Sequence, residues 1–450
     1  MITATDRATR VDHDQLLRTA TQVLIQNWHG HATVPSRSLY PHQWSWDSAF
    51  IALGLRHFAP RRAAVELLSL VGAQWDDGRI PHIVFNPAVP ASAYFPGPGF
   101  WRSAAVNPRL PVATSGIIQP PVHAVAARAV ADRLGARGTA FATRIYPHLV
   151  AQHAYLRRCR TGWSGLAAVL HPWETGLDNS PAWDVPLQAV SVDLSLFGNY
   201  TRRDTAHADA GERPTDEDYA RYIRLALAYR DHGYDDGWAR TSAEFLVLDP
   251  AFNALWAWSE LALADLARRI GADPGPHRAE AARISEALLD HLWSDQRGLF
   301  LSLDERQGQL SNERTVAGLI PLVLPDLPAA VVSTLVTTMT GDSFRAADPG
   351  VRGVPSFDLT DRRYDPQRYW RGPTWLNTTW LVIRGLQEHA GRGLADKLTA
   401  DLIELVSSAG LREYFDPETG SGHGTSNFSW SAALVVEMLT ELSDSPAVAA

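Results

Sequence analysis

Apolar residues recur at three- and four-residue spacing along almost the whole chain, in stretches dominated by Ala, Leu and Arg. This spacing places apolar side chains on one face of an α-helix, and these residues favour helix. Strand patterns are short and few, such as Gly298–Leu303. The sequence therefore predicts an all-α fold, a toroid of paired helices. The predicted helices are Gln15–Trp28, Ser48–Phe58, Arg61–Gln74, His123–Leu134, Ala140–Arg158, Asp216–Tyr229, Ala251–Ile270, His277–Trp293, Ala330–Met339, Trp375–Gln387, Ala395–Ser408 and Phe428–Leu442.

Long polar and aromatic connections separate these helices, and several of the chain's 16 tryptophans lie in or beside them. Loops beyond about 12–15 residues are uncommon in compact domains unless they are functional. No Gly/Ser linker divides the chain, and Arg203–Asp216 is predicted to be an exposed polar segment. Although 450 residues would suffice for about three domains, we expect one domain over residues 1–450. Residues 78–112, 171–215 and 343–369 are predicted loop insertions on its functional face.

The composition of the chain excludes some classes of binding partner. The net charge is −8, without the basic excess typical of nucleic-acid-binding surfaces. The only cysteine, Cys159, cannot form an intramolecular disulfide, and there is neither an apolar leader nor a run of about 18 apolar residues. We therefore expect a cytoplasmic protein without a membrane segment. Metal-binding, phosphate-loop, dinucleotide and serine-hydrolase motifs are missing, so we expect no metal or cofactor, and a small-molecule partner. A homo-oligomer is compatible with a helical surface.

Two tryptophan-rich motifs predict a ligand wall. In YPHQWSWDSAF, which begins at Tyr40, Trp44, Trp46 and Asp47 directly precede a predicted helix. An indole can cover the apolar face of a sugar ring while a carboxylate accepts hydrogen bonds from its hydroxyls. Asp47 as a helix cap, with the tryptophans in the core, fits the residues equally well. In YWRGPTW, Trp370, Arg371 and Trp375 are the candidates for lining the same ligand site. The alternative is that the two tryptophans belong to the core and that the arginine forms a surface salt bridge.

Two further segments present carboxylates from turns. HPWETGLDNSPAWD places Asp178 before Asn-Ser-Pro, which excludes a helix through the proline. An Asx-turn is the alternative interpretation, and Glu174 and Asp184 are rivals for any chemical role. LREYFDPETGSGHG places Glu413 ahead of a glycine-rich turn that would let the backbone approach a ligand, unless it is a solvated surface turn.

Taken together and in this order, these motifs, with GRIPH at Gly78–His82, resemble glycoside hydrolase family 63 from about Trp28 to Leu434. The closest similarity is to its short bacterial enzymes acting on glucosylglycerate and mannosylglycerate. The resemblance implies an (α/α)6 barrel, with six inner and six outer helices, and an inverting mechanism. It makes Asp178 the general acid and Glu413 the general base. It also implies that Trp46 and Asp47 bind the sugar and that Trp370 and Arg371 line the same pocket. Ala182 departs from the arginine that often follows the proline of the acid loop.

The predicted mechanism requires particular surroundings for the two catalytic carboxyl groups. An inverting pair needs a carboxylic acid and a carboxylate about 6.5–9.5 Å apart. We expect apolar and anionic surroundings to raise the pKa of Asp178, and Glu413 to lie in a wetter setting that keeps it ionised. For a glycerate group, Tyr40, Tyr94 and Gln119 offer suitable polar groups, and Arg102 and Arg371 offer charge. The segment 86–101 is a candidate lid.

The substrate predicted first is glucosylglycerate, cleaved to glucose and glycerate. Mannosylglycerate, trehalose or a gluco-oligosaccharide is the alternative, because one hydroxyl contact can decide between sugars. More remote are a sugar epimerase, which would need paired histidines in the pocket, and a non-catalytic sugar-binding protein.

Overall fold

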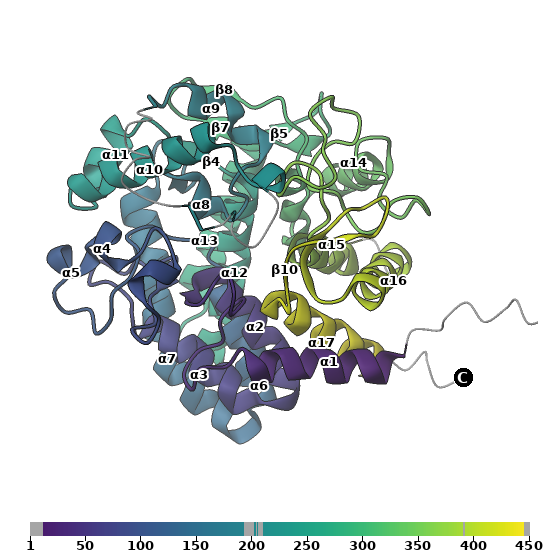
Figure 1. The fold of residues 1–450 in the computed structure, drawn as a ribbon, viewed down its shortest axis with the longest axis horizontal. Coiled ribbons are helices and arrows are strands. Elements are labelled where there is room, and N and C mark those ends of the chain that lie inside the picture. The colour runs from purple at the N-terminus through teal and green to yellow at the C-terminus, as the bar shows by residue number, and fades with distance from the viewer. Residues whose placement is uncertain (1–11, 193–201, 204, 206–209, 390–391, 445–450) are drawn as a thin grey trace, which may run out of the picture.

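The structure, a computed structural model, describes residues 12–192, 202–203, 205, 210–389 and 392–444. Helices predominate (Figure 1). The longer ones are α1 (His13–Gln26), α2 (Ser45–Phe58), α3 (Pro60–Val71), α6 (His123–Arg133), α7 (Gly138–Tyr155), α10 (Asp216–Asp231), α12 (Pro250–Ile270), α13 (Gly275–Leu292), α14 (Ala329–Thr340), α15 (Leu376–His389), α16 (Arg392–Ala409) and α17 (Ser429–Asp444). The shorter ones are α4 (Pro98–Trp101), α5 (Ser103–Val106), α8 (Pro172–Thr175), α9 (Asp184–Gln188) and α11 (Asp236–Ser242).

Local sequence sets the limits of these helices. Asp249 precedes α12 and accepts a hydrogen bond from the Phe252 amide, while Pro250 occupies the first turn. The same helix ends at Gly271, whose φ of 78° is the left-handed conformation that glycine adopts without strain. Thr215 and Asp218 form a reciprocal capping box at the start of α10.

The packing of helices follows a closed circuit. Helix α2 packs against α6, α6 against α12, and α12 against η8 (Ile320–Val323). From there η8 packs against α15, α15 against α17, and α17 back against α2, so the last helix of the chain lies beside the first ones (Figure 1). A second set of helices, α1, α3, α7, α13 and α16, packs against members of this circuit. In α13 the buried residues follow three- and four-residue spacing, as expected for a helix with one buried face.

Each predicted helix overlaps a helix of the structure, which confirms the predominantly helical fold. One position differs from the prediction. Between α12 and α15 the circuit passes through η7 (Val316–Gly318) and η8, which are short 3-10 turns in a stretch for which the sequence predicts no helix. Pro321 cannot continue a regular helix from the preceding turn. A Cβ atom on Gly318 would lie 2.2 Å from the carbonyl oxygen of Phe300, so close packing limits this segment as well.

Short antiparallel strands shape the loops on the functional face. Strand β1 (Gln43–Trp44) pairs with β2 (Ile83–Val84), and β9 (Arg412–Phe415) pairs with β10 (Gly422–Ser426). A small sheet runs in the order β3 (Ala168–Val169), β4 (Val247–Leu248), β7 (Leu303–Asp304) and β8 (Gln309–Leu310). Strands β5 (Trp293–Ser294) and β6 (Leu299–Phe300) form a separate pair. Among the described residues, no helix is both long and apolar enough to cross a membrane.

Candidate active site

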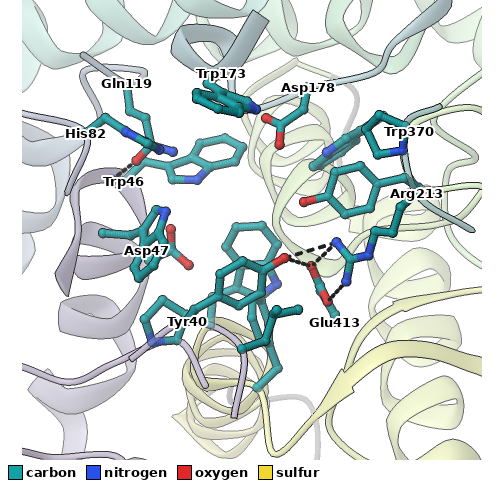
Figure 2. A pocket seen from close by; sticks show the side chains of 18 of the residues that line it. Tyr40, Trp46, Asp47, His82, Gln119, Trp173, Asp178, Arg213, Trp370 and Glu413 are labelled. Atoms are coloured by element: carbon teal, nitrogen blue, oxygen red, sulfur yellow. Dashed lines mark hydrogen bonds and ion pairs between the residues drawn. The ribbon is translucent and has the colours of Figure 1, made fainter. Parts of the chain in front are cut away.

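One pocket of about 850 Å³, including the space at its open mouth, collects side chains from the long loops. Figure 2 shows the carboxylates of Asp47, Asp178 and Glu413 in this pocket, with aromatic rings between them. The pocket is lined by Pro35, Leu39, Tyr40, Trp44, Trp46, Asp47, His82, Tyr94, Phe95, Gln119, Trp173, Gly176, Asp178, Arg213, Pro214, Tyr219, Tyr369, Trp370, Glu413, Phe428 and Trp430. Most of the residues predicted to bind or cleave a ligand therefore meet in one place.

Glu413 lies on β9 and is 1 % exposed. Its Oε1 accepts a hydrogen bond from the Tyr40 hydroxyl at 2.8 Å, and its Oε2 accepts one from the Thr425 amide at 3.0 Å. Gly424, with φ of 64°, lies directly against this carboxylate, where a Cβ atom would come within 2.4 Å of Oε2. The glycine-rich hairpin thus lets the backbone approach the carboxylate closely.

Arg213 pairs with Glu413 inside the pocket. Its Nη2 donates to Glu413 Oε2 at 2.9 Å and its Nη1 donates to the Tyr40 hydroxyl at 3.0 Å, while the guanidinium lies over the ring of Tyr369 at 4.6 Å (Figure 2). Although burial opposes its charge, Glu413 helps to hold the pKa of Arg213 well above the ordinary value. A guanidinium so paired can be buried without being left uncompensated.

The prediction that Arg203–Asp216 is an exposed polar segment is wrong at Arg213, which is 3 % exposed. The preceding residue, Glu212, holds the segment against the hairpin through the Tyr414 hydroxyl at 3.0 Å and His423 Nδ1 at 2.7 Å. The partners of Glu212 and Arg213 lie about 200 positions further along the sequence, so the polar composition of the segment alone did not reveal them.

Asp178 follows α8 in a turn, and its side chain points into the pocket between Trp173 and Trp370 (Figure 2). The turn is fixed by its backbone: the carbonyl of Asp178 accepts a hydrogen bond from the Tyr222 hydroxyl at 2.9 Å, and that of Leu177 accepts one from Trp183 Nε1 at 2.7 Å. Its rivals Glu174 and Asp184 are not among the lining residues, since both are held in ion pairs with arginine.

The expected environment of Glu413 needs correction. Glu413 was expected in the wetter setting, but it is almost fully buried, whereas Asp178 is partly exposed. In place of solvent, the carboxylate of Glu413 contacts the guanidinium of Arg213 at 2.9 Å.

Asp47 is the third carboxylate of the pocket. It lies in the first turn of α2, which begins at Ser45 and not at Ser48 as predicted, and the capping position belongs to Trp44, so Asp47 is not the helix cap. Burial, followed by the charges of Glu413 and Asp178, raises the pKa of Asp47 well above the ordinary value. Asp47, Asp178 and Glu413 line the same pocket, so the two other carboxylates act on Asp47 through their negative charge.

Aromatic rings form the walls. Trp46 and Trp44 line one part, and Trp44 meets Tyr94 edge to face with ring centroids 5.2 Å apart. The amide of Trp46 donates to Gln119 Oε1 at 3.2 Å. His82 stacks with Trp173, and burial lowers the pKa of His82 to about 3, so it is neutral near pH 7.

Arg371 and Trp375 are not among the lining residues and lie one layer behind them. Trp375 stacks on Trp370 with ring centroids 3.8 Å apart and planes 5° apart. Arg371 forms an ion pair with Asp184 at 2.6 Å, which ties it to the loop of Asp178. Arg102, the other cation considered for a ligand, is exposed and does not line the pocket.

Sequence patterns did not single out several residues of the pocket: His82 stood only within a motif, and Phe95, Tyr219, Tyr369 and Phe428 were not proposed as ligand contacts. In the described ranges, no group of three or more His, Cys, Asp or Glu side chains is arranged to hold a metal ion.

Comparison with known proteins places the chain among sugar-cleaving enzymes. Residues 40–431 match the family described as mannosylglycerate hydrolase MGH1-like glycoside hydrolase domain. A mannosylglycerate hydrolase of Rubrobacter radiotolerans is 39 % identical, covering 95 % of this chain and 97 % of its own. A glucosylglycerate hydrolase of Mycolicibacterium hassiacum is 33 % identical over 94 % and 98 %, respectively. The crystal structure of a family 63 mannosylglycerate hydrolase from Thermus thermophilus in complex with Tris superimposes with a TM-score of 0.87 at 38 % identity, covering 94 % of this chain and 99 % of that one.

Proposed function

Because the chain belongs to glycoside hydrolase family 63, among relatives that include mannosylglycerate and glucosylglycerate hydrolases, we propose that it is an inverting hydrolase of a small α-glycoside of glycerate. The observation that carries the proposal is the position of Asp178 and Glu413 in one aromatic-walled pocket, contributed by loops far apart in the sequence (Figure 2). Such a pocket suits a sugar ring, and two carboxyl groups are what inverting hydrolysis requires.

In the proposed reaction Asp178, protonated, donates its proton to the glycosidic oxygen as the bond to the anomeric carbon breaks. Glu413 accepts a proton from a water molecule, whose oxygen attacks the anomeric carbon from the opposite face of the ring. Asp178 ends as a carboxylate and Glu413 as a carboxylic acid, and the released sugar has the β configuration. The hydrogen bonds from Tyr40 and Arg213 fix the orientation of Glu413 for this step.

The sugar is proposed to lie between Trp46 and Trp370. The stack of Trp375 behind Trp370 fixes the plane of that wall. Asp47, close to both catalytic candidates, is the group proposed to bind the sugar hydroxyls. A carboxyl group with a raised pKa can donate a hydrogen bond to one hydroxyl and accept one from another.

The glycerate group is proposed to lie near Arg213. Arg213 is the only arginine or lysine among the residues that line the pocket in the described part of the chain. A guanidinium recognises a carboxylate through paired hydrogen bonds. Tyr40, Tyr94 and Gln119 line the same pocket and supply further polar groups. Arg213 thus takes the place that Arg102 and Arg371 have in the sequence-based prediction.

The circuit of helices supports an (α/α)6 barrel as the scaffold. In this proposal the inner positions are α2, α6, α12, η7–η8, α15 and α17, and the outer positions are α1, α3, α7, α13, α14 and α16. The long insertions 78–112, 171–215 and 343–369 then belong to one catalytic domain.

Mannosylglycerate is the substrate we place first, because the relative of higher identity and the superimposed crystal structure both carry that name. Glucosylglycerate, the sequence-based first choice, comes second, supported by the relative at 33 % identity. The two sugars differ at one hydroxyl, so a single contact can reverse the order.

The test is to incubate the purified chain with mannosylglycerate, glucosylglycerate, trehalose and maltose, and to follow release by proton NMR. We expect mannose or glucose together with glycerate from the first two, with the β-anomer appearing before mutarotation. No hydrolysis of any α-glycoside would refute the proposal, and an initial α-anomer would refute inversion.

The catalytic assignment is tested by Asp178→Asn and Glu413→Gln. Each variant should lower kcat by about 10²–10⁴-fold, the usual contribution of a general acid or base. Glu418→Gln, an exposed carboxylate in the same hairpin as Glu413, is the matched control and should keep wild-type turnover. Near-wild-type turnover by either folded catalytic variant would overturn its assigned role.

A further inference from the structure

Arg160 and Glu174 form a fully buried ion pair directly behind the loop that carries Asp178. Arg160 Nη1 donates to Glu174 Oε2 at 2.7 Å, and Nη2 donates to Oε1 at 2.8 Å. Both side chains are 0 % exposed. The contact is the two-pronged arrangement in which a guanidinium fixes the plane and the position of a carboxylate.

Glu174 also accepts two backbone hydrogen bonds, which come from two segments far apart in the sequence. The amide of Leu170 donates to Oε2 at 2.7 Å, and the amide of Ile118 donates to Oε1 at 3.2 Å. Ile118 directly precedes Gln119, a lining residue of the pocket. One carboxylate therefore ties together the loop of Asp178 and the segment of Gln119.

A short, constrained stretch of chain joins Glu174 to Asp178. Gly176 has a φ of 73°, and a Cβ atom there would lie 2.5 Å from the Trp46 ring. The amide of Leu177 donates to Thr175 Oγ1 at 2.9 Å, and Leu177 then accepts the bond from Trp183. Because Gly176 is packed against the Trp46 ring, this stretch has little freedom to absorb a displacement of Glu174, which would therefore be passed on to Asp178.

The other side of the pair is fixed as well. Arg160 ends η3 (Leu156–Arg160), a π-helical turn after α7, and its Nε donates to Asp236 Oδ1 at 2.8 Å. Although burial favours protonation, Arg160 and Arg79 keep the pKa of Asp236 below the ordinary value. Arg79 belongs to the GRIPH motif and donates to Asp236 Oδ2 at 3.2 Å. The motif thus contributes a buried cation to this network, in addition to His82 in the pocket wall.

Stability alone is a weak reason for this arrangement. Taking two charges out of water costs several kcal/mol per ion, which the attraction between them roughly cancels, so apolar residues of similar volume often serve as well. What the pair offers instead is a fixed geometry, because all the donors around Glu174 converge on two oxygen atoms.

We propose that the Arg160–Glu174 pair positions the general acid: it holds the loop of Asp178 so that the carboxyl group reaches the glycosidic oxygen. The proposal rests on the proposed function, in which Asp178 is that acid. Glu174 and Arg160 touch no substrate and act through the loop.

The experiment compares two substrates of the same sugar. One is the glycerate glycoside, whose alkoxide leaving group needs a proton. The other is the α-glycosyl fluoride, whose fluoride leaves without one. Glu174→Gln keeps the shape of the side chain and removes its charge. We expect kcat for the glycerate glycoside to fall about 10²-fold, the effect of misplacing a reacting group by about 1 Å. Turnover of the fluoride should fall less than about threefold.

Glu437→Gln is the matched control, because Glu437 is a carboxylate of similar burial that pairs with Arg56 and Arg384 away from the pocket lining. It should lower thermal stability while leaving the ratio of the two substrates unchanged. Arg160→Lys, which keeps the charge and loses the two-pronged contact, should change the ratio in the same direction as Glu174→Gln. If Glu174→Gln does not fold, Arg160→Lys still tests the positioning role.

Equal losses on both substrates in the Glu174 and Arg160 variants would overturn the positioning role, and so would an unchanged kcat. Asp178→Asn separates this failure from failure of the proposed function. That variant should lose turnover of the glycerate glycoside and keep most turnover of the fluoride. If it does not, the assignment of Asp178 itself is wrong, whatever Glu174 does.

Discussion

A single methyl group at position 424 should lower the activity strongly by moving Glu413. Gly424 has a φ of 64°, and a Cβ atom there would lie 2.4 Å from Glu413 Oε2 and 2.8 Å from Glu413 Cβ. Ordinary contact begins near 3.4 Å, so one of the two groups must move by about 1 Å. The carboxylate cannot simply swing away, because Arg213 and the Thr425 amide hold the same oxygen.

The magnitude has two parts. A side chain in the left-handed region costs about 1–2 kcal/mol, and the loss of a glycine from the unfolded chain returns about 0.4–1 kcal/mol, which leaves a stability loss of about 1 kcal/mol from the backbone. Displacing a catalytic group by about 1 Å costs about 10²-fold in rate. Gly424→Ala should therefore lower kcat about 10²-fold with only a small fall in the midpoint of thermal unfolding.

Gly420 provides the control for the backbone cost. It lies in the same hairpin with a φ of 75°, but a Cβ atom there would meet nothing closer than 3.6 Å. Gly420→Ala should lose similar backbone stability and keep its activity. Initial rates on the glycerate glycoside and thermal unfolding would be measured for both variants. Equal rates in the two variants would refute the argument that the hairpin glycine makes room for the carboxylate.

Three further outcomes are expected. Arg213→Met should abolish the preference for a glycerate glycoside over the matched glycerol glycoside, because among the described residues that line the pocket only Arg213 carries a guanidinium or ammonium group; a retained preference in kcat/KM would exclude it as the carboxylate partner. Trp375→Leu should raise KM about tenfold, since it removes a stack worth about 0.5–1.5 kcal/mol from behind Trp370, and an unchanged KM would contradict that role. Acid should destabilise the fold through Glu437: although burial favours protonation, His57, Arg56 and Arg384 lower its pKa to about 2. Its stabilising contribution, about 3 kcal/mol, is complete above the ordinary pKa of 4.5 and is lost as the pH falls toward 2. Unfolding midpoints between pH 7 and pH 3 should therefore fall less steeply in Glu437→Gln than in the parent.

Helix positions were predictable from the sequence because burial of one face leaves a three- and four-residue pattern in each helix. One segment of the circuit, residues 316–323, has no such pattern. The stretch that contains η7 and η8 is apolar throughout, so it carries no periodicity, and Pro321 breaks it into turns. Only its contacts with α12 and α15 show that it occupies a place in the circuit of helices.

The site was partly predictable for a different reason. Asp47, Asp178 and Glu413 stand in motifs whose turn-forming residues mark them locally. Arg213 has no such marker, because its role comes from Glu413 and Tyr40, which lie 200 and 173 positions away. For the same reason, Arg371 was assigned to the ligand when its partner is Asp184 of the acid loop. Pairing across the fold is decided by the closure of the helical circuit, which a local pattern does not contain.

The distribution of arginines fits the proposed division of labour between the carboxyl groups. Arg213 pairs directly with Glu413 and holds the carboxylate of the proposed general base in place. On the acid loop, Arg160 pairs with Glu174 and Arg371 pairs with Asp184, and these two carboxylates stand on either side of Asp178 in the sequence. These two arginines therefore hold the acid loop through the carboxylates on either side of Asp178.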